Sequence, residues 1–564
     1  MRSMGDLFRR GLGFLCLVLV VSFAARSAGA NETSPPVSMM GEGRPLDTVA
    51  EIVMPPVDAA ALLAEDEERL GDQLDAPNRF AFAHRVDLRP SDEGTWEVLG
   101  DGSRLWRLRI RSDGAFSLNV GFTTFRLPEG ATFHFFAPDG STVWGPYTAE
   151  NAVEGEFWSP ILRGDEAVLE LFVPANASFE AELFLASVNH DYRGFAKTAA
   201  QKLMQGYCNN DVICPVGDPW RDDIRSEGVY TVSGSWYCSG QMLNTAIAEN
   251  PPPYFLTAYH CGVTTSNDQT VRIYWNFESP TCGQLCCGSL AQNQYGTIFR
   301  SRYSTSDFCL LQCSADPPEA FNVYYAGWDA TGQSVSSAVG IHHPNCDEKA
   351  ISFQYDPLTV TSYLSNSVPG NGSHWRVDDW EDGTTEPGSS GSGLWDNRHR
   401  LVGQLHGGYA SCSSITSDWY GRFSVSWNGG GTMTTRLVDW LDPTSSGVLY
   451  IDGRDPGDID TDVESGRPVN QDRGLLFSIN PNPVRGSSHI FFELKKPGRV
   501  ELEVFNASGR LVSKVPAKTY PAGTTNVTWD GTSPGAGALP DGIYFVRMLV
   551  DDQTAGTQKF VMIR

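Results

Sequence analysis

The sequence predicts an all-β protein of several domains. Its 564 residues exceed the roughly 250–300 residues that one hydrophobic core serves, so roughly two to four domains are expected. Strand-like runs recur: residues 106–110, 500–505 and 542–547 alternate apolar and polar side chains, and residues 168–173 are mostly apolar. Turn signals such as Pro138-Asp139-Gly140 lie between such runs. Short strands separated by turns are typical of β-sandwiches and β-barrels.

Composition and charge narrow the functional classes. Apolar residues make up 41% of the chain and charged residues 19%, which is typical of globular rather than disordered protein. The formal net charge of -25 repels phosphate backbones and anionic membrane surfaces. We therefore expect no nucleic-acid partner and no membrane surface as partner.

Residues 1–30 predict a secretory signal peptide. Arg2, Arg9 and Arg10 precede an apolar run over residues 12–25, and a small-residue tripeptide ends at Ala30. This order predicts cleavage after Ala30. A membrane anchor is the alternative, but the run is shorter than the ~20 residues that span a bilayer. No later segment is long and apolar enough to span, so we expect a soluble, secreted protein.

The cysteines are confined to one part of the mature chain. Of the 12 cysteines, Cys16 lies in the signal peptide and the other eleven lie between Cys208 and Cys412. Export favours disulfides within one domain. Zinc binding is the alternative for two groups with ligand-like spacing: Cys282, Cys286 and Cys287, and the pair Cys309 and Cys313. Because eleven is odd, at least one thiol is expected to be free or paired outside the chain.

Composition divides the mature chain into blocks. Residues 31–202 lack cysteine and carry strand-like runs, residues 203–452 carry the cysteines, and residues 475–564 resume alternation. Residues 453–474 are acidic and rich in Gly, Pro and Asp, which predicts a linker.

Three motifs in the middle block point to nucleophilic catalysis. Residues 388–393 read Gly-Ser-Ser-Gly-Ser-Gly, and a glycine turn can expose a serine hydroxyl while backbone N–H groups converge on an oxyanion. His260 ends an apolar strand-like run and can accept the serine proton. Asp307 lies among apolar residues and needs a hydrogen-bonding partner. Each signal is weak alone, but the order His, Asp, Ser matches one catalytic arrangement. We predict Ser390 as nucleophile, His260 as general base and Asp307 as the group that orients the base.

The middle block resembles the bacterial lysyl endopeptidases. The similar stretches are residues 208–214, 255–262, 306–308, 326–329, 341–345, 385–392 and 403–408. This resemblance implies a chymotrypsin-like double β-barrel, the triad named above, and an oxyanion hole formed by the backbone N–H groups of Gly388 and Ser390.

The resemblance also implies a specificity site. In this family the acid that binds the substrate lysine lies in a stretch that appears here as residues 417–422, so Asp418 is the predicted carboxylate. His406 matches a histidine that flanks the active site and stacks on a tryptophan, and we predict that it contributes to substrate binding. No tryptophan occupies the expected place, which is near Asn366.

The resemblance implies three disulfides as well: Cys208–Cys412, Cys214–Cys282 and Cys238–Cys261. The pairing of the remaining cysteines does not follow from the sequence: Cys286, Cys287, Cys309, Cys313 and Cys346.

The flanking blocks resemble parts of exported proteases. Residues 31–202 are similar to the β-rich propeptide of these enzymes, and residues 475–564 resemble immunoglobulin-like modules of the type IX sorting or FlgD-like kind, with an adhesive spacer as the alternative. Self-cleavage between Lys202 and Leu203 would place Cys208 sixth in the mature chain; the alternative is that Lys202 is a solvated linker residue.

Together these features predict a secreted serine endopeptidase that prefers lysine at P1 and acts on proteins or peptides. We expect a monomer that needs no cofactor and no metal, and that engages a secretion machinery through its C-terminal domain. The alternatives are a preference for arginine or a broader one, and an inactive protease-like adhesion protein.

Overall fold

The computed structural model describes residues 34–72, 77–195, 206, 208–247, 250–284, 286–458 and 477–563, apart from positions 495, 508, 522, 534–536 and 552. The predicted cleavage site after Ala30 and the predicted processing residues Lys202 and Leu203 lie outside the described residues, as does most of the predicted linker.

The N-terminal block forms two facing β-sheets. One sheet has the order β1-β5-β11-β7-β8, with β4 also paired to β5, and the other has the order β10-β6-β12-β3, with β9 paired to β6. The strands are β1 (Glu51–Val53), β3 (Ala81–Leu88), β4 (Thr95–Val98), β5 (Arg104–Arg111), β6 (Ser117–Arg126), β7 (Thr132–Phe136), β8 (Val143–Tyr147), β9 (Phe157–Trp158), β10 (Leu162–Arg163), β11 (Glu166–Val173) and β12 (Glu182–Asp191). The helical elements are η1 (Val37–Met40), η2 (Leu46–Thr48), α1 (Ala59–Asp72) and η3 (Ala149–Asn151).

The alternating and apolar runs of this block are buried strands. Leu108 and Ile110 of β5 and Leu169 and Leu171 of β11 are completely buried between the sheets. The predicted turn at Pro138-Asp139-Gly140 joins β7 to β8. Burial of these side chains supplies the main driving force for the sandwich.

The middle block forms two further sheets, whose strands curl into the two barrels. The first sheet has the order β18-β17-β14-β15-β16-β20-β19 and the second β13-β23-β22-β26-β27-β28-β25-β24. The first contains β14 (Glu227–Val232), β15 (Trp236–Leu243), β16 (Tyr254–Ala258), β17 (Arg272–Trp275), β18 (Asn293–Tyr295), β19 (Thr297–Tyr303) and β20 (Phe308–Cys313). The second contains β13 (Asn210–Asp211), β22 (Ala338–His342), β23 (Ala350–Gln354), β24 (Thr359–Thr361), β25 (His374–Val377), β26 (Gly393–Asp396), β27 (Arg400–Gly408) and β28 (Asp418–Arg422), and β21 (Gly327–Asp329) and β29 (Tyr450–Ile451) pair along its side.

Helices in the middle block are short and connect the strands. They are η5 (Pro215–Trp220), α2 (Arg221–Ser226), η6 (Tyr259–Cys261), η7 (Asp268–Thr270), η8 (Glu319–Phe321), η9 (Pro344–Cys346), α3 (Phe423–Asn428) and α4 (Val438–Leu441). Nowhere in the described part of the chain does a helix have the length and apolar character needed to cross a membrane.

The C-terminal block is a seven-stranded immunoglobulin-like module with the order β33-β32-β37-β38-β30-β31-β34, and a short β35-β36 pair beside it. Its strands are β30 (Phe477–Arg485), β31 (Ser487–Leu494), β32 (Gly498–Asn506), β33 (Leu511–Tyr520), β34 (Gly523–Trp529), β35 (Thr532–Ser533), β36 (Gly537–Ala538), β37 (Gly542–Val550) and β38 (Gln553–Met562). The alternating runs at 500–505 and 542–547 lie in β32 and β37, which pair with each other. The prediction of an all-β protein is therefore confirmed.

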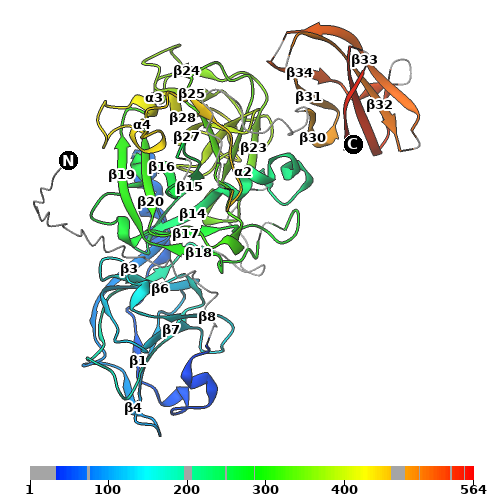
Figure 1. The fold of residues 1–564 in the computed structure, drawn as a ribbon. Coiled ribbons are helices and arrows are strands. Elements are labelled where there is room, and N and C mark those ends of the chain that lie inside the picture. The colour runs from blue at the N-terminus through cyan, green and yellow to red at the C-terminus, as the bar shows by residue number, and fades with distance from the viewer. Residues whose placement is uncertain are drawn as a thin grey trace, which may run out of the picture.

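The N-terminal sandwich packs against the first barrel (Figure 1). Strand β2 (Asn78–Arg79) extends the barrel sheet by pairing with β15, and the Phe80 amide donates to the carbonyl of Ser235 over 2.9 Å. Asn119 Nδ2 donates to the Gly234 carbonyl over 2.9 Å. Buried polar groups on both sides are thus hydrogen-bonded, as a stable interface requires.

Candidate active site

His260 sits where the first barrel closes on the second. Strand β16 leads directly into the single turn η6, which carries His260, and the turn ends at Gly262 with the left-handed φ of 77°. A disulfide between Cys238 and Cys261 fixes the turn to strand β15. Strand β16 and the disulfide therefore fix the backbone at His260. The His260 side chain is only 4% exposed.

Asp307 reaches His260 because of strand pairing. Ala258 at the end of β16 pairs with Phe308 at the start of β20, so the residues just outside that pair approach one another. The carboxylate accepts from His260 Nδ1 over 2.8 Å and from the His260 backbone amide over 3.0 Å. Asp307 has a left-handed φ of 56°, a conformation that is costly for a non-glycine residue and often marks functional sites.

Ser390 lies on a loop between the barrels that strand β15 holds in place. The Ser239 amide donates to the Ser390 carbonyl over 2.8 Å, and the Ser239 hydroxyl donates to the Gly388 carbonyl over 2.9 Å. Cys261 Sγ lies 3.9 Å from the Ser390 carbonyl oxygen, so the serine loop contacts the turn that carries His260. His260 Nε2 is buried and has no hydrogen-bond partner among the described residues, which leaves it available to a hydroxyl.

The serine loop has the backbone geometry of an anion-binding turn. Gly388 has a φ of 98°, and a Cβ placed there would lie 2.2 Å from the Tyr237 ring, so only glycine fits. Ser389 donates its amide to the Glu386 carbonyl over 3.1 Å. The amides of Gly388 and Ser390 on either side donate to no group in the described part of the chain. Two unengaged amides beside a serine are the donors that a developing oxyanion requires.

Two residues that sequence reasoning missed, the buried His342 and the half-buried Glu386, support this loop. His342 Nδ1 lies 2.8 Å from Ser389 Oγ, and burial lowers the pKa of His342 to about 3, so this imidazole is neutral. Glu386 Oε2 accepts from the Gly206 amide over 3.0 Å and from Asn209 Nδ2 over 2.6 Å. His342 and Glu386 both lie in stretches that carry the family resemblance, which was the available signal.

His406 lies on the Asp307 side of the site. Its ring stacks on His260 with centroids 5.4 Å apart, and its Nε2 lies 3.7 Å from Asp307 Oδ1. The missing tryptophan is replaced by Tyr363, whose ring stacks on His406 at 3.5 Å and 4°. Tyr363 is three residues before the expected position at Asn366, and only the folded loop brings it over the imidazole. His406 thus contacts His260, Asp307 and Tyr363, and its role in substrate binding stays a prediction.

Asp418 forms a buried carboxylate at the start of β28. It is 1% exposed, and one oxygen, Oδ2, accepts from Trp380 Nε1 over 2.8 Å and from Thr385 Oγ1 over 2.6 Å. Its partner in the sheet is Gly408, where a Cβ would lie 2.3 Å from Asp418 Oδ1. Burial raises the pKa of Asp418 to about 6, against the hydrogen bonds from Thr385, Trp380 and the Ala410 backbone, which lower it. Trp380 and Thr385 hold the carboxylate in one orientation, and sequence reasoning did not identify them.

The cysteines form disulfides and buried thiols. The structure joins Cys208 to Cys412, Cys214 to Cys282 and Cys238 to Cys261, the pairs that the resemblance implied, and also the neighbours Cys286 and Cys287. The zinc alternative for the first group is wrong, because disulfide sulfurs are not thiolate ligands.

Three described cysteines stay unpaired and buried: Cys309, Cys313 and Cys346. Burial raises the pKa of Cys309 to about 12, and it raises the pKa of Cys313 as well. These thiols are therefore protonated at neutral pH, which disfavours the zinc alternative for this pair also.

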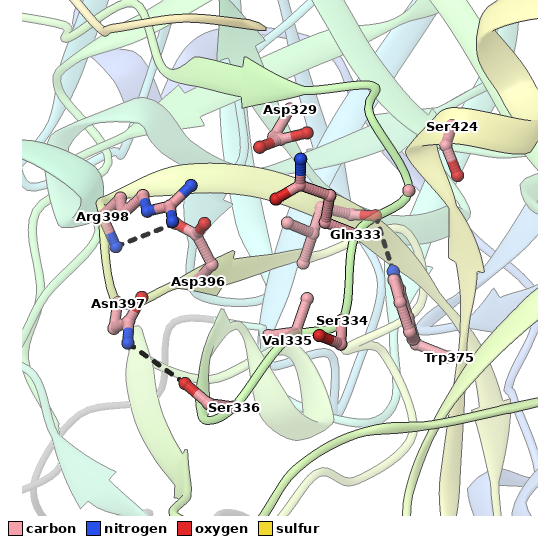
Figure 2. A pocket seen from close by; sticks show the side chains of 12 residues that line it. Asp329, Gln333, Ser334, Val335, Ser336, Trp375, Asp396, Asn397, Arg398 and Ser424 are labelled. Carbon is pink, nitrogen blue, oxygen red and sulfur yellow. Dashed lines mark hydrogen bonds between the residues drawn. The ribbon is translucent and has the colours of Figure 1, made fainter. Parts of the chain in front are cut away.

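A separate cavity lies on the second barrel (Figure 2). Its volume is about 250 Å³. Asp329, Trp375 and Asp396 are among its lining residues, and Asn397 Nδ2 donates to Ser336 Oγ at its edge. None of the predicted site residues lines it, so this cavity is distinct from the candidate active site.

Three protein-family models match the N-terminal, middle and C-terminal blocks of the chain separately. A model of the lysyl endopeptidase C-terminal domain matches residues 204–421, one of the lysyl endopeptidase N-terminal domain matches residues 53–190, and one of the FlgD Ig-like domain matches residues 485–553. A lysyl endopeptidase of Pseudomonas aeruginosa is 28% identical over an alignment of 358 residues, and the match covers 58% of this chain and 75% of that protein.

Solved structures with a similar fold include two proteases. One is a Glu endopeptidase in complex with MPD, at 16% identity and a TM-score of 0.25, covering 39% of this chain and 94% of the other. Kallikrein-related peptidase 10 is similar at 13% identity and a TM-score of 0.26, covering 40% and 98%.

The fold and the site together define a serine endopeptidase with a chymotrypsin-like double β-barrel. More particularly, residues 53–190 and 204–421 are similar to the N-terminal and C-terminal domains of the lysyl endopeptidases, and residues 485–553 are similar to an FlgD Ig-like domain. The resemblance drawn from the sequence is confirmed, and the alternative of an inactive adhesion protein is not supported.

Proposed function

We propose that this protein is a secreted endopeptidase that cleaves after lysine. The observation that carries the proposal is the buried Asp418 carboxylate, which accepts from Trp380 and Thr385 at Oδ2 and from the Ala410 backbone, and which forms no ion pair in the described part of the chain. A buried carboxylate is costly unless a cation pairs with it. The ammonium of a P1 lysine is the cation that such a site accepts.

The proposed chemistry is peptide hydrolysis through an acyl-enzyme. Ser390 Oγ attacks the scissile carbonyl carbon while His260 Nε2 takes its proton, and His260 later returns that proton to the leaving amine. Asp307 holds Nδ1–H of His260 and stabilises the imidazolium. The amides of Gly388 and Ser390 stabilise the tetrahedral oxyanion.

Asp418 accounts for the charge preference at P1. Two opposite charges 4 Å apart attract by about 4 kcal/mol at an effective dielectric near 20, before desolvation is counted. A compact ammonium needs only one oxygen, whereas a planar guanidinium is matched best by two. Because Oδ2 is already occupied by Trp380 and Thr385, lysine is favoured over arginine.

Cleavage sites in a denatured protein mixture test this preference. We expect most new C-termini to be lysine and a small minority arginine, identified by mass spectrometry of the peptides. Equal cleavage after both residues would leave the protease class intact and contradict the lysine preference. The matched control is the same digest with the Ser390→Ala form, which should yield no new termini.

The N-terminal sandwich is proposed to be a prosegment that the enzyme removes itself. Its strand β2 extends the sheet that holds the serine loop, so it suits an element that supports folding of the protease. Cleavage between Lys202 and Leu203 would release the protease shortly before the Cys208–Cys412 disulfide, and linkers are where nicking concentrates.

Replacing Lys202 by glutamine should therefore block maturation at this bond. N-terminal sequencing of the active secreted enzyme is expected to begin Leu-Met-Gln-Gly-Tyr, and the Lys202→Gln form should accumulate uncut. Lys197→Gln is the matched control and should mature normally. Normal maturation of Lys202→Gln would contradict self-processing at this site while leaving the triad assignment untouched.

The C-terminal module is proposed to serve export or surface attachment. It has its own hydrophobic core, which includes Val504, Val546 and Phe560, and therefore needs no packing against the protease to fold. A self-contained β-sandwich after a linker suits a sorting module, with the signal peptide directing the first export step.

A further inference from the structure

Behind Asp307 a series of buried polar side chains runs away from the triad through the second barrel. His406 Nδ1 lies 3.0 Å from His374 Nε2, and His374 Nδ1 lies 2.6 Å from Ser373 Oγ. The Ser373 hydroxyl also lies 2.6 Å from Asn371 Oδ1. Ser373 and His374 are each 1% exposed and His406 is 7% exposed, so water does not mediate these contacts.

The imidazoles of His374 and His406 are both neutral, so each carries one ring proton. Burial lowers the pKa of His374 to about 4. Burial lowers the pKa of His406 as well, with smaller contributions from His260 and His374. A neutral imidazole donates from one nitrogen and accepts at the other, so the tautomer of one ring determines the tautomer of its partner.

Two hydrogen-bond directions are compatible with these distances. In the first, the Ser373 hydroxyl donates to His374 Nδ1, His374 Nε2–H donates to His406 Nδ1, and His406 Nε2–H faces Asp307. In the second, the Ser373 hydroxyl donates to Asn371 Oδ1 and His374 Nδ1–H donates to Ser373 Oγ. His406 Nδ1–H then donates to His374 Nε2, and the lone pair of His406 Nε2 faces the Asp307 carboxylate.

The carboxylate decides between the two directions. An ionised Asp307 can only accept hydrogen bonds, and in a buried site an N–H dipole that faces it is favourable whereas a lone pair is not. Asn371 Oδ1 keeps a donor in both cases, because it also accepts from the Ser373 amide over 3.0 Å. The first direction therefore satisfies every group and places a proton between His406 and Asp307.

We propose that His374 is a positioning residue for the catalytic reaction, which holds His406 in the Nε2–H tautomer that faces Asp307. This inference rests on the proposed triad. His374 contacts neither substrate nor the reacting atoms; it acts through His406, whose N–H limits the negative charge that Asp307 presents to His260. Strand β25 fixes His374 in place through the pairs His374–Gly421 and His374–Thr361.

Two variants of His374 separate positioning from packing. Glutamine can place an N–H2 group near the position of Nε2 and keep the donor to His406, whereas leucine fills similar space without a donor. We expect His374→Leu to lose about tenfold in kcat/KM on the acid side of the pH profile, where a larger fraction of His260 is then protonated and cannot take the Ser390 proton. His374→Gln should return to within about threefold of the parent.

The pH profile and an NMR signature provide readouts that packing does not change. In His374→Leu the acid limb of kcat/KM should move to higher pH, because Asp307 without the His406 N–H stabilises the His260 imidazolium more strongly; His374→Gln should match the parent. Imidazole ¹⁵N spectra of the full chain in its Ser390→Ala form, which avoids autolysis, should show His406 protonated at Nε2.

Each outcome is decisive. Equal kinetics and pH profiles for the leucine and glutamine variants would overturn the proposal, as would a His406 proton on Nδ1 in the parent spectrum. The spectrum decides the question even if His374→Leu fails to fold. Failure of the triad itself would appear differently, as activity that survives in Ser390→Ala.

Discussion

Replacing Ser390 by alanine is expected to reduce kcat/KM for a lysyl ester or peptide by about 10⁴–10⁶-fold, leaving the background supplied by binding and the oxyanion donors. The loop should keep its shape, because its anchors from Ser239 bind the carbonyls of Gly388 and Ser390 and not the Ser390 hydroxyl. Steady-state kinetics and labelling by a fluorophosphonate measure the effect, and the variant should not be labelled.

Ser392→Ala is the matched control, since this serine lies in the same motif and is buried. It should stay within about tenfold of the parent and remain labelled. Turnover of Ser390→Ala within tenfold of the parent would mean that another residue is the nucleophile.

Replacing Asp418 by asparagine should reduce kcat/KM for lysyl substrates by about 10²–10⁴-fold, because a buried ammonium without a counter-charge costs about 3–5 kcal/mol. The asparagine carbonyl can still accept from Trp380 and Thr385, so the packing around residue 418 should persist. Rates on matched lysyl and uncharged P1 substrates measure the loss, which should fall mainly on lysine.

The same variant should be more stable than the parent at neutral pH. In the folded protein the pKa of Asp418 is about 6, above the ordinary value of about 3.9 expected in the unfolded chain. The folded state therefore binds the proton of the Asp418 carboxyl group more tightly than the unfolded chain does. The stability that the protonated carboxyl group contributes is present below about pH 4 and is lost as the pH rises through about 6.

Asp418→Asn removes that loss, so at pH 8 its free energy of unfolding should exceed the parent's by about 1–3 kcal/mol, with the difference vanishing near pH 4. Urea unfolding at the two pH values measures it. Asp378→Asn is the matched control, because this carboxylate is 46% exposed and paired with Arg376; it should change neither lysine preference nor this pH dependence. An unchanged lysine preference in Asp418→Asn would place the specificity site elsewhere.

Loss of lysine activity together with a gain in stability would show that the buried Asp418 carboxylate destabilises the substrate-free enzyme. A charge held in a buried site is destabilising until its partner arrives, and binding of the substrate ammonium then recovers part of that cost. The donors from Trp380 and Thr385 keep the empty carboxylate in one orientation, which reduces the reorganisation needed when lysine binds.

Local patterns in the sequence were sufficient to predict the strands and the order of the catalytic motifs. Alternation at 106–110, 500–505 and 542–547 predicted strands that lie in β5, β32 and β37, because side chains in a strand alternate between two faces and burial of one face leaves a pattern of period two. His260, Asp307 and Ser390 were predicted from residue types in their local settings, since a strand end, a buried acid and a glycine turn each need only a few neighbouring residues.

Only the tertiary structure decided which distant side chains share the site. Tyr363 stands over His406 where a tryptophan was expected at Asn366, since the course of a loop depends on what it packs against. Trp380 and Thr385 meet Asp418, and His374 meets His406. These hydrogen bonds join residues 32 to 38 positions apart. His374 and His406 meet because β25 and β27 both pair with β28, whereas Trp380 and Thr385 reach Asp418 from the segment between β25 and β26. Neither arrangement leaves a periodic signal in the local sequence.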